Sequence, residues 1–261
     1  MNEEEIIARI KNLRLIDDIF FNKVMEISRE CLELVLRIIL DIDDLHVEEV
    51  ITQCDVPNVI YKGVRFDVLA TAKGKIYDIE IQRSDEGAIP RRARYNSSML
   101  DSRSLAKGVD YQKLPESYVI FITEHDVLKK NLPIYHIERM ITETNESFND
   151  ASHIIYVNGE NRDDSKLGRL MQDFFCRDPH KLNYKEIAEC SIYLKESKEG
   201  VTFMSPVVEE IYNQGLAVGE KKLIDVIKNL INAGMPIEFI KNVTGYNEEQ
   251  IIEIIEQNQK N

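Results

Sequence analysis

The chain contains few cysteine and histidine residues, and none of them is spaced as metal-binding or disulfide-forming motifs require. The four cysteines form no C-x-x-C pair, which argues against both a disulfide framework and a zinc site. The five histidines show no metal-ligand spacing, and no serine-histidine-aspartate arrangement stands out. We therefore expect reduced, structural cysteines at Cys31, Cys54, Cys176 and Cys190.

Long hydrophobic runs are also missing. The longest ones, such as residues 34–40 and 119–123, are far too short to cross a bilayer. The opening Met-Asn-Glu-Glu-Glu does not resemble a signal peptide. With 43% hydrophobic and 30% charged residues, the composition is that of an ordinary folded protein, and we expect it to be cytoplasmic.

Acidic residues outnumber basic ones, 46 to 33, but one segment carries a net positive charge. The formal net charge of −13 argues against a protein that coats nucleic acid with its whole surface, because non-specific binding depends on basic residues that neutralise phosphates. Between Arg91 and Lys107, however, five cations stand against the single acid Asp101. Any contact with nucleic acid is expected in this segment.

The stretch from Arg65 to Gln82 predicts a β-hairpin. Two runs with strand-like alternation flank Lys73-Gly74, and the glycine can adopt the positive φ that a tight turn requires. If the loop consists of these two residues, the numbers of paired residues add up to 147. Asp67 then lies directly opposite Glu80, with both side chains on one face of the sheet.

Alternation along the strands assigns the remaining hairpin side chains to faces. Gln82 joins Asp67 and Glu80 on the face that carries the chemistry. The opposite face is predicted to be core and consists of Phe66, Val68, Ala70, Tyr77, Ile79 and Ile81. The alternative is an exposed hairpin whose polar face happens to carry acids.

Two carboxylates opposite each other repel, so the pair either raises one pKa or recruits a cation. Oxygen ligands without nearby histidine or cysteine favour Mg²⁺, for which Mn²⁺ can substitute. Mg²⁺ commonly takes one or two carboxylates, keeps several waters and completes its shell with phosphate oxygens. Asp67 and Glu80 therefore predict a metal site, and a phosphate ester is the implied substrate.

A helix is predicted from Pro90 to about Gly108, since proline suits a first helical turn and glycine a C-terminal cap. Because this helix follows the Glu80 strand after a short loop, its first turn starts close to the acidic face. Arg91, Arg92 and Tyr95 are the candidate DNA-binding residues, with phosphates as their targets. A solvated basic helix is the alternative.

The order of predicted elements is αβββαβ. Helical spacing covers residues 3–40, a strand lies near 48–54 and precedes the hairpin, and a buried strand at 118–123 follows the basic helix. Further strands are expected at 135–143 and 153–157, and only helices after residue 163. This order predicts an α/β (α+β) fold in which helices flank a mixed sheet.

The C-terminal part is predicted to contain short amphipathic helices at 217–233, 237–243 and 247–256. Their layout is similar to a helix-turn-helix. The last helix, however, carries Glu248, Glu249 and Glu253 and no basic residue, which is the wrong sign for a DNA groove. We interpret this tail as a packing element or as the contact through which a homo-oligomer assembles.

The segment RFDVLA…YDIEIQ…RRARYNSSMLDSRSLAKGVDYQKL…YVIFIT resembles the Rpn family of recombination-promoting nucleases, which are transposase-like members of the PD-(D/E)XK nuclease superfamily. The resemblance implies a restriction-endonuclease-like core at 1–163, a helical extension and tail at 164–261, and a Mg²⁺-dependent endodeoxyribonuclease active in DNA recombination. It assigns metal binding to Asp67 and Glu80. Because the first core helix of such folds sometimes adds an acid to the metal site, it also makes Glu33 a candidate for an extra acid. Gln82 stands where the superfamily often has a catalytic lysine, so Asp67, Glu80 and Gln82 are the candidate catalytic residues.

Two alternatives remain open from the sequence. One is a catalytically inactive nuclease fold that serves as a binding or regulatory module and oligomerises through its tail. Gln82 supports it because an amide cannot supply the positive charge of a lysine. The other is a metal-dependent ribonuclease, which differs only in its substrate.

Overall fold

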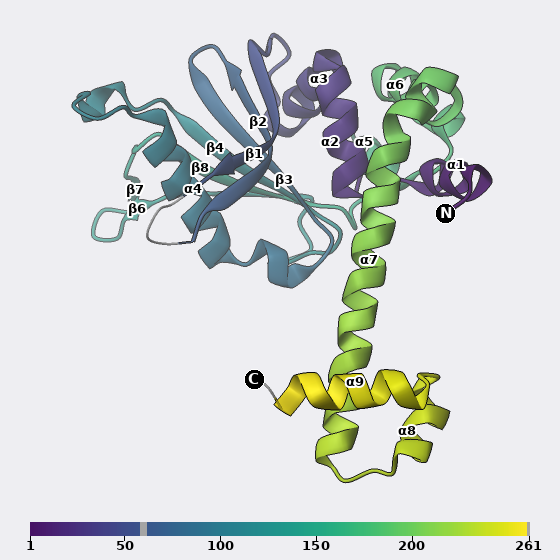
Figure 1. Ribbon diagram of the computed structural model, residues 1–261. Helices are drawn as coiled ribbons and strands as arrows, with labels where there is room; N and C mark the ends of the chain where they lie inside the picture. Colours follow the sequence, from purple (N-terminus) through teal and green to yellow (C-terminus); the bar gives the residue numbers. More distant parts are fainter. Residues whose placement is uncertain (58–61, 260–261) are drawn as a thin grey trace. The chain divides into compact units, whose positions relative to one another are not determined.

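A computed structural model of the protein describes residues 1–57 and 62–259 (Figure 1). The chain divides into two compact units, Asn2–Met204 and Ser205–Asn261, the second of which also includes Met1. The sequence suggested a different boundary, at residue 163, where strands give way to helices. This domain boundary stays a prediction.

The larger unit is organised around a mixed six-stranded sheet. Its first three strands form an antiparallel meander, β4 runs parallel to β3 and to β8, and β5 is antiparallel to β8. In spatial order the strands are β1 (Glu49–Val56), β2 (Val64–Ala72), β3 (Lys75–Gln82), β4 (Ser117–Thr123), β8 (Ser152–Asn158) and β5 (Ile134–Ile137). The single strand predicted at 135–143 is instead β5 followed by β6 (Met140–Ile141), which pairs with β7 (Glu146–Ser147).

The predicted hairpin and its register are confirmed. Lys73 and Gly74 both have positive φ, at 50° and 74°, as the two central residues of a type I′ turn require. Pairing runs from Ala72 opposite Lys75 to Val68 opposite Ile79, so the numbers of paired residues add up to 147. The turn therefore sets the register that brings the two acids to the same end of the hairpin.

Helix α4 (Pro90–Ser104) connects the parallel strands β3 and β4, after the short helix η1 (Asp85–Ala88). This connection completes the predicted αβββαβ order. The prediction that the helix reaches Gly108 is wrong, because Leu105 has an extended backbone. Gly108, with φ of 85°, serves the turn that follows, in which the Val109 N–H donates to the Ala106 carbonyl at 3.1 Å.

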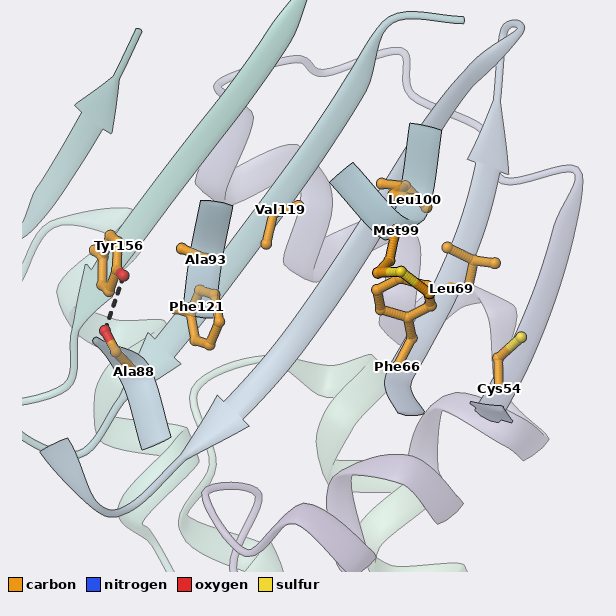
Figure 2. Close-up of a cluster of buried hydrophobic side chains, with 10 residues drawn as sticks. All are labelled: Cys54, Phe66, Leu69, Ala88, Ala93, Met99, Leu100, Val119, Phe121 and Tyr156. Carbon is orange, nitrogen blue, oxygen red and sulfur yellow. Dashed lines mark hydrogen bonds between the residues drawn. The ribbon is translucent and has the colours of Figure 1, made fainter. Parts of the chain in front are cut away.

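One face of the sheet packs against α4 (Figure 2). The Tyr156 hydroxyl donates to the Ala88 carbonyl at 2.8 Å and ties η1 to this layer. Phe66 belongs to the same cluster, so its predicted place on the opposite face is wrong, and the alternation of β2 breaks next to Asp67. The buried members of the cluster are Cys54, Phe66, Leu69, Ala88, Ala93, Met99, Leu100, Val119, Phe121 and Tyr156.

The sheet face that carries the acids is therefore covered by α4. The side chains on the opposite face of the hairpin strands are buried as well. Val68, Ala70, Tyr77, Ile79 and Ile81 all have relative exposures of 3% or less, as predicted for a core face. Strand β4 is buried along nearly its whole length, as its continuous apolar sequence predicts.

Helices at the N-terminus and after the sheet complete the larger unit. The predicted helical region 3–40 is three helices, because the chain leaves the helical conformation at Leu13 and again at Ser28. Asp17 occupies the N-cap position of the second helix, and its carboxylate accepts a hydrogen bond from the Arg14 N–H at 2.8 Å. These helices are α1 (Glu3–Asn12), α2 (Asp18–Ile27), α3 (Arg29–Leu40), α5 (Lys166–Phe175) and α6 (Lys185–Glu196).

The smaller unit is helical. Helix α7 (Lys198–Asn232) begins earlier than the predicted residue 217 and is followed by α8 (Ile237–Thr244) and α9 (Glu248–Gln259). Ile227, Ile240, Ile251 and Ile254 form its core. Among the described residues, no helix combines the length and hydrophobicity that a membrane crossing needs.

Candidate active site

The first acid of the site lies where the hairpin strands stop pairing. The ladder between β2 and β3 ends at Val68 and Ile79, one residue before Asp67 and Glu80 would face each other. Instead, the Asp67 carboxylate accepts a hydrogen bond from the Ile81 N–H at 3.0 Å. A side chain thus replaces a backbone acceptor here, and Asp67 is held against the end of β3.

Glu80 is fully buried, with a relative exposure of 0%. Its Oε2 accepts a hydrogen bond from Arg92 Nη2 at 2.9 Å, and Arg92 Nη1 donates to the Gly87 carbonyl at 2.9 Å. Oε1 of Glu80 has no hydrogen-bond partner among the described residues. Arg92, from the first turn of α4, therefore forms a hydrogen bond with one carboxylate oxygen of Glu80. The other oxygen is buried without a described hydrogen-bond donor or cation, which is unfavourable.

Asp78 is a third acid in the same place, and the sequence reasoning missed it. It lies two residues before Glu80, is fully buried, and its Oδ2 accepts from Asn96 Nδ2 at 3.4 Å. Its Oδ1 has no partner in the described part of the chain. The signal was available, because the alternation that joins Gln82 to Glu80 also joins Asp78 to them.

A cavity of about 480 Å³ opens beside Asp67. It brings together three of the predicted residues, Asp67, Gln82 and Arg92. Residues that the sequence reasoning did not select also line it: Asp18, Gln53, Arg65 and Arg83. Asp18 stands at the start of α2, so the N-terminal helices contribute a further acid to this cavity.

Gln53 has an unusual backbone for a strand residue. Its φ is 51°, although it lies inside β1, and the pairing of β1 with β2 skips it between Thr52 and Cys54. The skipped position is the one opposite Asp67. Positive φ in a residue other than glycine is uncommon, and it is concentrated at functional sites where the surrounding structure maintains it.

Burial raises the pKa values of all three acids, and repulsion by neighbouring acids adds to the rise at Asp67 and Asp78. Burial and the Glu80 charge raise the pKa of Asp67 to about 7, against the opposing hydrogen bond from the Ile81 N–H. Burial also raises the pKa of Glu80, although the Arg92 cation opposes this rise. The pKa of Asp78 is raised well above its ordinary value by burial and by its two acidic neighbours. A nearby cation would lower these values.

The residues fit a hard cation that needs few protein ligands. Within the described ranges, no group of three or more His, Cys, Asp or Glu side chains is arranged to hold a metal ion. Two carboxylates are nevertheless sufficient for Mg²⁺, which retains waters. The available donors are Asp67, which lines the cavity, and the unpaired oxygen of Glu80, which is fully buried and does not line it.

The candidate DNA-binding residues of α4 are not all oriented alike. Arg91 is exposed, and the described residues offer it no ion pair, whereas Arg92 points to Glu80. The hydroxyl of Tyr95 donates to the Lys62 carbonyl. Arg92 thus touches the acidic site, while Arg91 and Tyr95 lie on the exposed face of the helix.

Glu33 does not line the cavity. Its Oε1 accepts from the Val47 N–H at 2.9 Å, and its Oε2 accepts from Arg37 Nη2 at 2.8 Å. Glu33 therefore anchors the connection between α3 and β1, and it is not an extra acid of the site.

The raised pKa of Asp67 predicts how pH affects the stability of the metal-free protein. The folded state keeps the Asp67 proton up to about pH 7, whereas an unfolded aspartate loses it near pH 4, so wild-type stability falls between these values. In Asp67→Asn the side chain does not titrate, so the variant does not lose stability in this way as the pH rises. Its free energy of unfolding relative to wild type should rise by about 2 kcal/mol from pH 5 to pH 7. Urea denaturation with a chelator checks this, and an unchanged difference would contradict the shift.

Comparison with known proteins agrees with the geometry. Residues 41–166 match the family described as PD-(D/E)XK nuclease family transposase. No curated protein and no solved structure matches the chain. The matched segment contains the sheet, α4 and the acids of β2 and β3, and its mixed sheet flanked by helices is that of a restriction-endonuclease-like α/β fold. Residues 41–166 of this chain are therefore similar to the PD-(D/E)XK nuclease family transposases, which supports a function of the nuclease or transposase type.

Proposed function

We propose that the protein is a Mg²⁺-dependent DNA endonuclease whose metal site consists of Asp67 and Glu80. The observation that carries the proposal is the acid cluster at the end of β3, in which one buried oxygen of Glu80 has no described partner and the pKa of Asp67 is raised to about 7. Such a cluster is costly unless a cation compensates it. Mn²⁺ is expected to substitute, since it accepts the same oxygen ligands.

The chain's own groups have separate roles in this proposal. Arg92 fixes the orientation of Glu80 through its hydrogen bond to Oε2. The Gln82 side chain approaches Gly87 so closely that a Cβ there would lie 1.9 Å from its Oε1, so Gly87 leaves room for the amide. We assign Gln82 to orient the attacking water, while a bound Mg²⁺ would neutralise the scissile phosphodiester and activate that water. Arg91 and Tyr95 would position the DNA backbone beside Asp67.

The remaining expectations from the sequence stay proposals. They are a core at 1–163, a helical extension at 164–261, a cytoplasmic location, a role in DNA recombination and a homo-oligomer formed through the C-terminal helices. The acidic first turn of α9, with Glu248 and Glu249, is consistent with assembly rather than with DNA binding by this helix.

A nuclease fold that has lost activity is the second candidate. The observation that favours it is the pairing of Glu80 with Arg92, because a cation of the protein itself already neutralises this carboxylate. Gln82 also supplies no positive charge for the leaving group.

Metal binding and cleavage separate the two candidates. Purified protein should nick supercoiled plasmid DNA with Mg²⁺ or Mn²⁺ and not with a chelator. A calorimetric Mn²⁺ titration should show a site that disappears in Asp67→Ala and persists in Asp44→Ala, a matched change at an exposed aspartate. Binding without nicking would favour the inactive module, and the absence of a site that depends on Asp67 would refute the metal assignment.

A further inference from the structure

A second groove lies at the other end of α4. It has a volume of about 910 Å³, and α4 contributes Ser98, Asp101 and Ser102 to its lining. The loop after the helix contributes Leu105 and Val109, and the short helix η2 (Tyr111–Lys113) contributes Tyr111. The Tyr111 side chain has a relative exposure of 84%, the largest among the exposed hydrophobic residues of the described chain.

The exposed face of α4 runs from the first helical turn, where the neighbouring Arg92 contacts Glu80, to this groove. Arg91, Arg94, Tyr95, Ser98 and Ser102 recur at three- and four-residue intervals and are all exposed. From Arg91 to Ser102 the helix rises about 17 Å, which corresponds to about five nucleotides at 3.4 Å each. A strand that passes the acids could therefore follow this face into the groove.

The charges along this path favour a polyanion. Arg91, Arg94 and Lys107 form no ion pair with any described residue, although the chain as a whole is strongly acidic. Two acids also line the groove, and each accepts a hydrogen bond from a neutral donor: Asp110 accepts from the Gln112 N–H at 2.9 Å and Asp101 from the Ser117 hydroxyl at 3.3 Å, and neither forms an ion pair with these three cations. The cations are left to interact with phosphates.

The groove itself suits a flat, partly apolar group. Tyr111 offers an aromatic ring, Leu105 and Val109 offer apolar surface, and Lys107 adds a cation at the edge. A base within a duplex exposes only its edges in the grooves, whereas an unpaired base can stack on an aromatic ring. We propose that this groove binds an unpaired base of single-stranded DNA, about five nucleotides from the bond at the acidic site. The spacing to that bond rests on the proposed nuclease function.

DNA binding in the presence of a chelator tests this site without requiring cleavage. The probes are fluorescently labelled duplexes, either blunt or with a 3′ or 5′ overhang of about ten unpaired nucleotides, twice the length that the α4 face spans. Full-length wild type should bind one of the overhang probes more tightly than the blunt duplex. Tyr111→Ala should weaken this binding about tenfold, since stacking on one aromatic ring has an effect of that order. Tyr111→Phe should retain it.

Tyr193→Ala is the matched control, because Tyr193 is an exposed tyrosine on α6 that lines neither cavity. It should leave binding to every probe unchanged. Equal losses on blunt and overhang probes with Tyr111→Ala, or no loss on either, would overturn the proposal. If the overhang preference depends on Tyr111 but plasmid is not nicked, the groove assignment stands and the nuclease proposal fails.

Discussion

Glu80→Gln is expected to lower the rate of DNA nicking by about 10³-fold, the upper range for removing a single group that stabilises charge at a reaction centre. Glutamine has the same shape as glutamate and can still accept the hydrogen bond from Arg92 Nη2. It cannot, however, supply a charged ligand to Mg²⁺. The loss should therefore arise from the metal site and not from misfolding.

The measurement is the initial rate of plasmid nicking at saturating Mg²⁺, together with a thermal melt of each protein. Glu86→Gln is the matched control, since Glu86 is an exposed acid on η1, close in sequence to the site. This control should nick at the wild-type rate. If Glu80→Gln nicks as fast as the control does, Glu80 has no catalytic role.

Arg92→Ala is expected to destabilise the folded protein by about 3 kcal/mol, because it leaves the fully buried Glu80 carboxylate without its partner, although the Arg92 side chain itself is 38% exposed. Glu80 would then be a fully buried carboxylate that has lost its only hydrogen bond from a cation. Arg91→Ala, the neighbouring change on the exposed side of α4, should alter stability by less than about 0.5 kcal/mol.

A double-mutant cycle separates the ion pair from the loss of packing around Arg92. In Arg92→Ala combined with Glu80→Gln, position 80 no longer carries a buried charge that has lost its partner, so much of the lost stability should return. Urea denaturation at neutral pH in the absence of metal gives the four free energies. If the two changes are additive, the hydrogen bond between Arg92 and Glu80 contributes nothing to the fold, and Arg92 is available for DNA alone.

Local chemistry made part of this structure predictable. Lys73-Gly74 specifies a two-residue turn, and the period of two then fixes which residues of β2 and β3 face each other. The continuous apolar run of β4 marks a strand that is buried on both faces. These features depend on residues close together in the chain, and so the hairpin turn, the αβββαβ order and the starting point of α4 could be predicted from sequence.

Other features depend on contacts between distant segments. Asp18 reaches the cavity only because α2 packs beside the hairpin, and nothing in its own neighbourhood indicates this. Gln53 adopts a positive φ that glutamine does not favour on its own, so its sequence gives no warning. Arg92 looks like a phosphate contact on a helical wheel, whereas burial of Glu80 draws it into an ion pair. The position of Asp78 could have been predicted, because alternation along β3 places its side chain on the same face as Glu80 and Gln82.

The most direct test of the metal site is a crystal structure of the protein soaked in Mn²⁺, with data collected for anomalous scattering. The proposal predicts an anomalous peak within coordination distance of carboxylate oxygens of both Asp67 and Glu80, at about 2.0–2.3 Å. In Asp67→Ala crystals this peak should be missing. A well-ordered site without any peak there, or with Mn²⁺ bound only elsewhere, would contradict the assignment of these two acids as the metal centre.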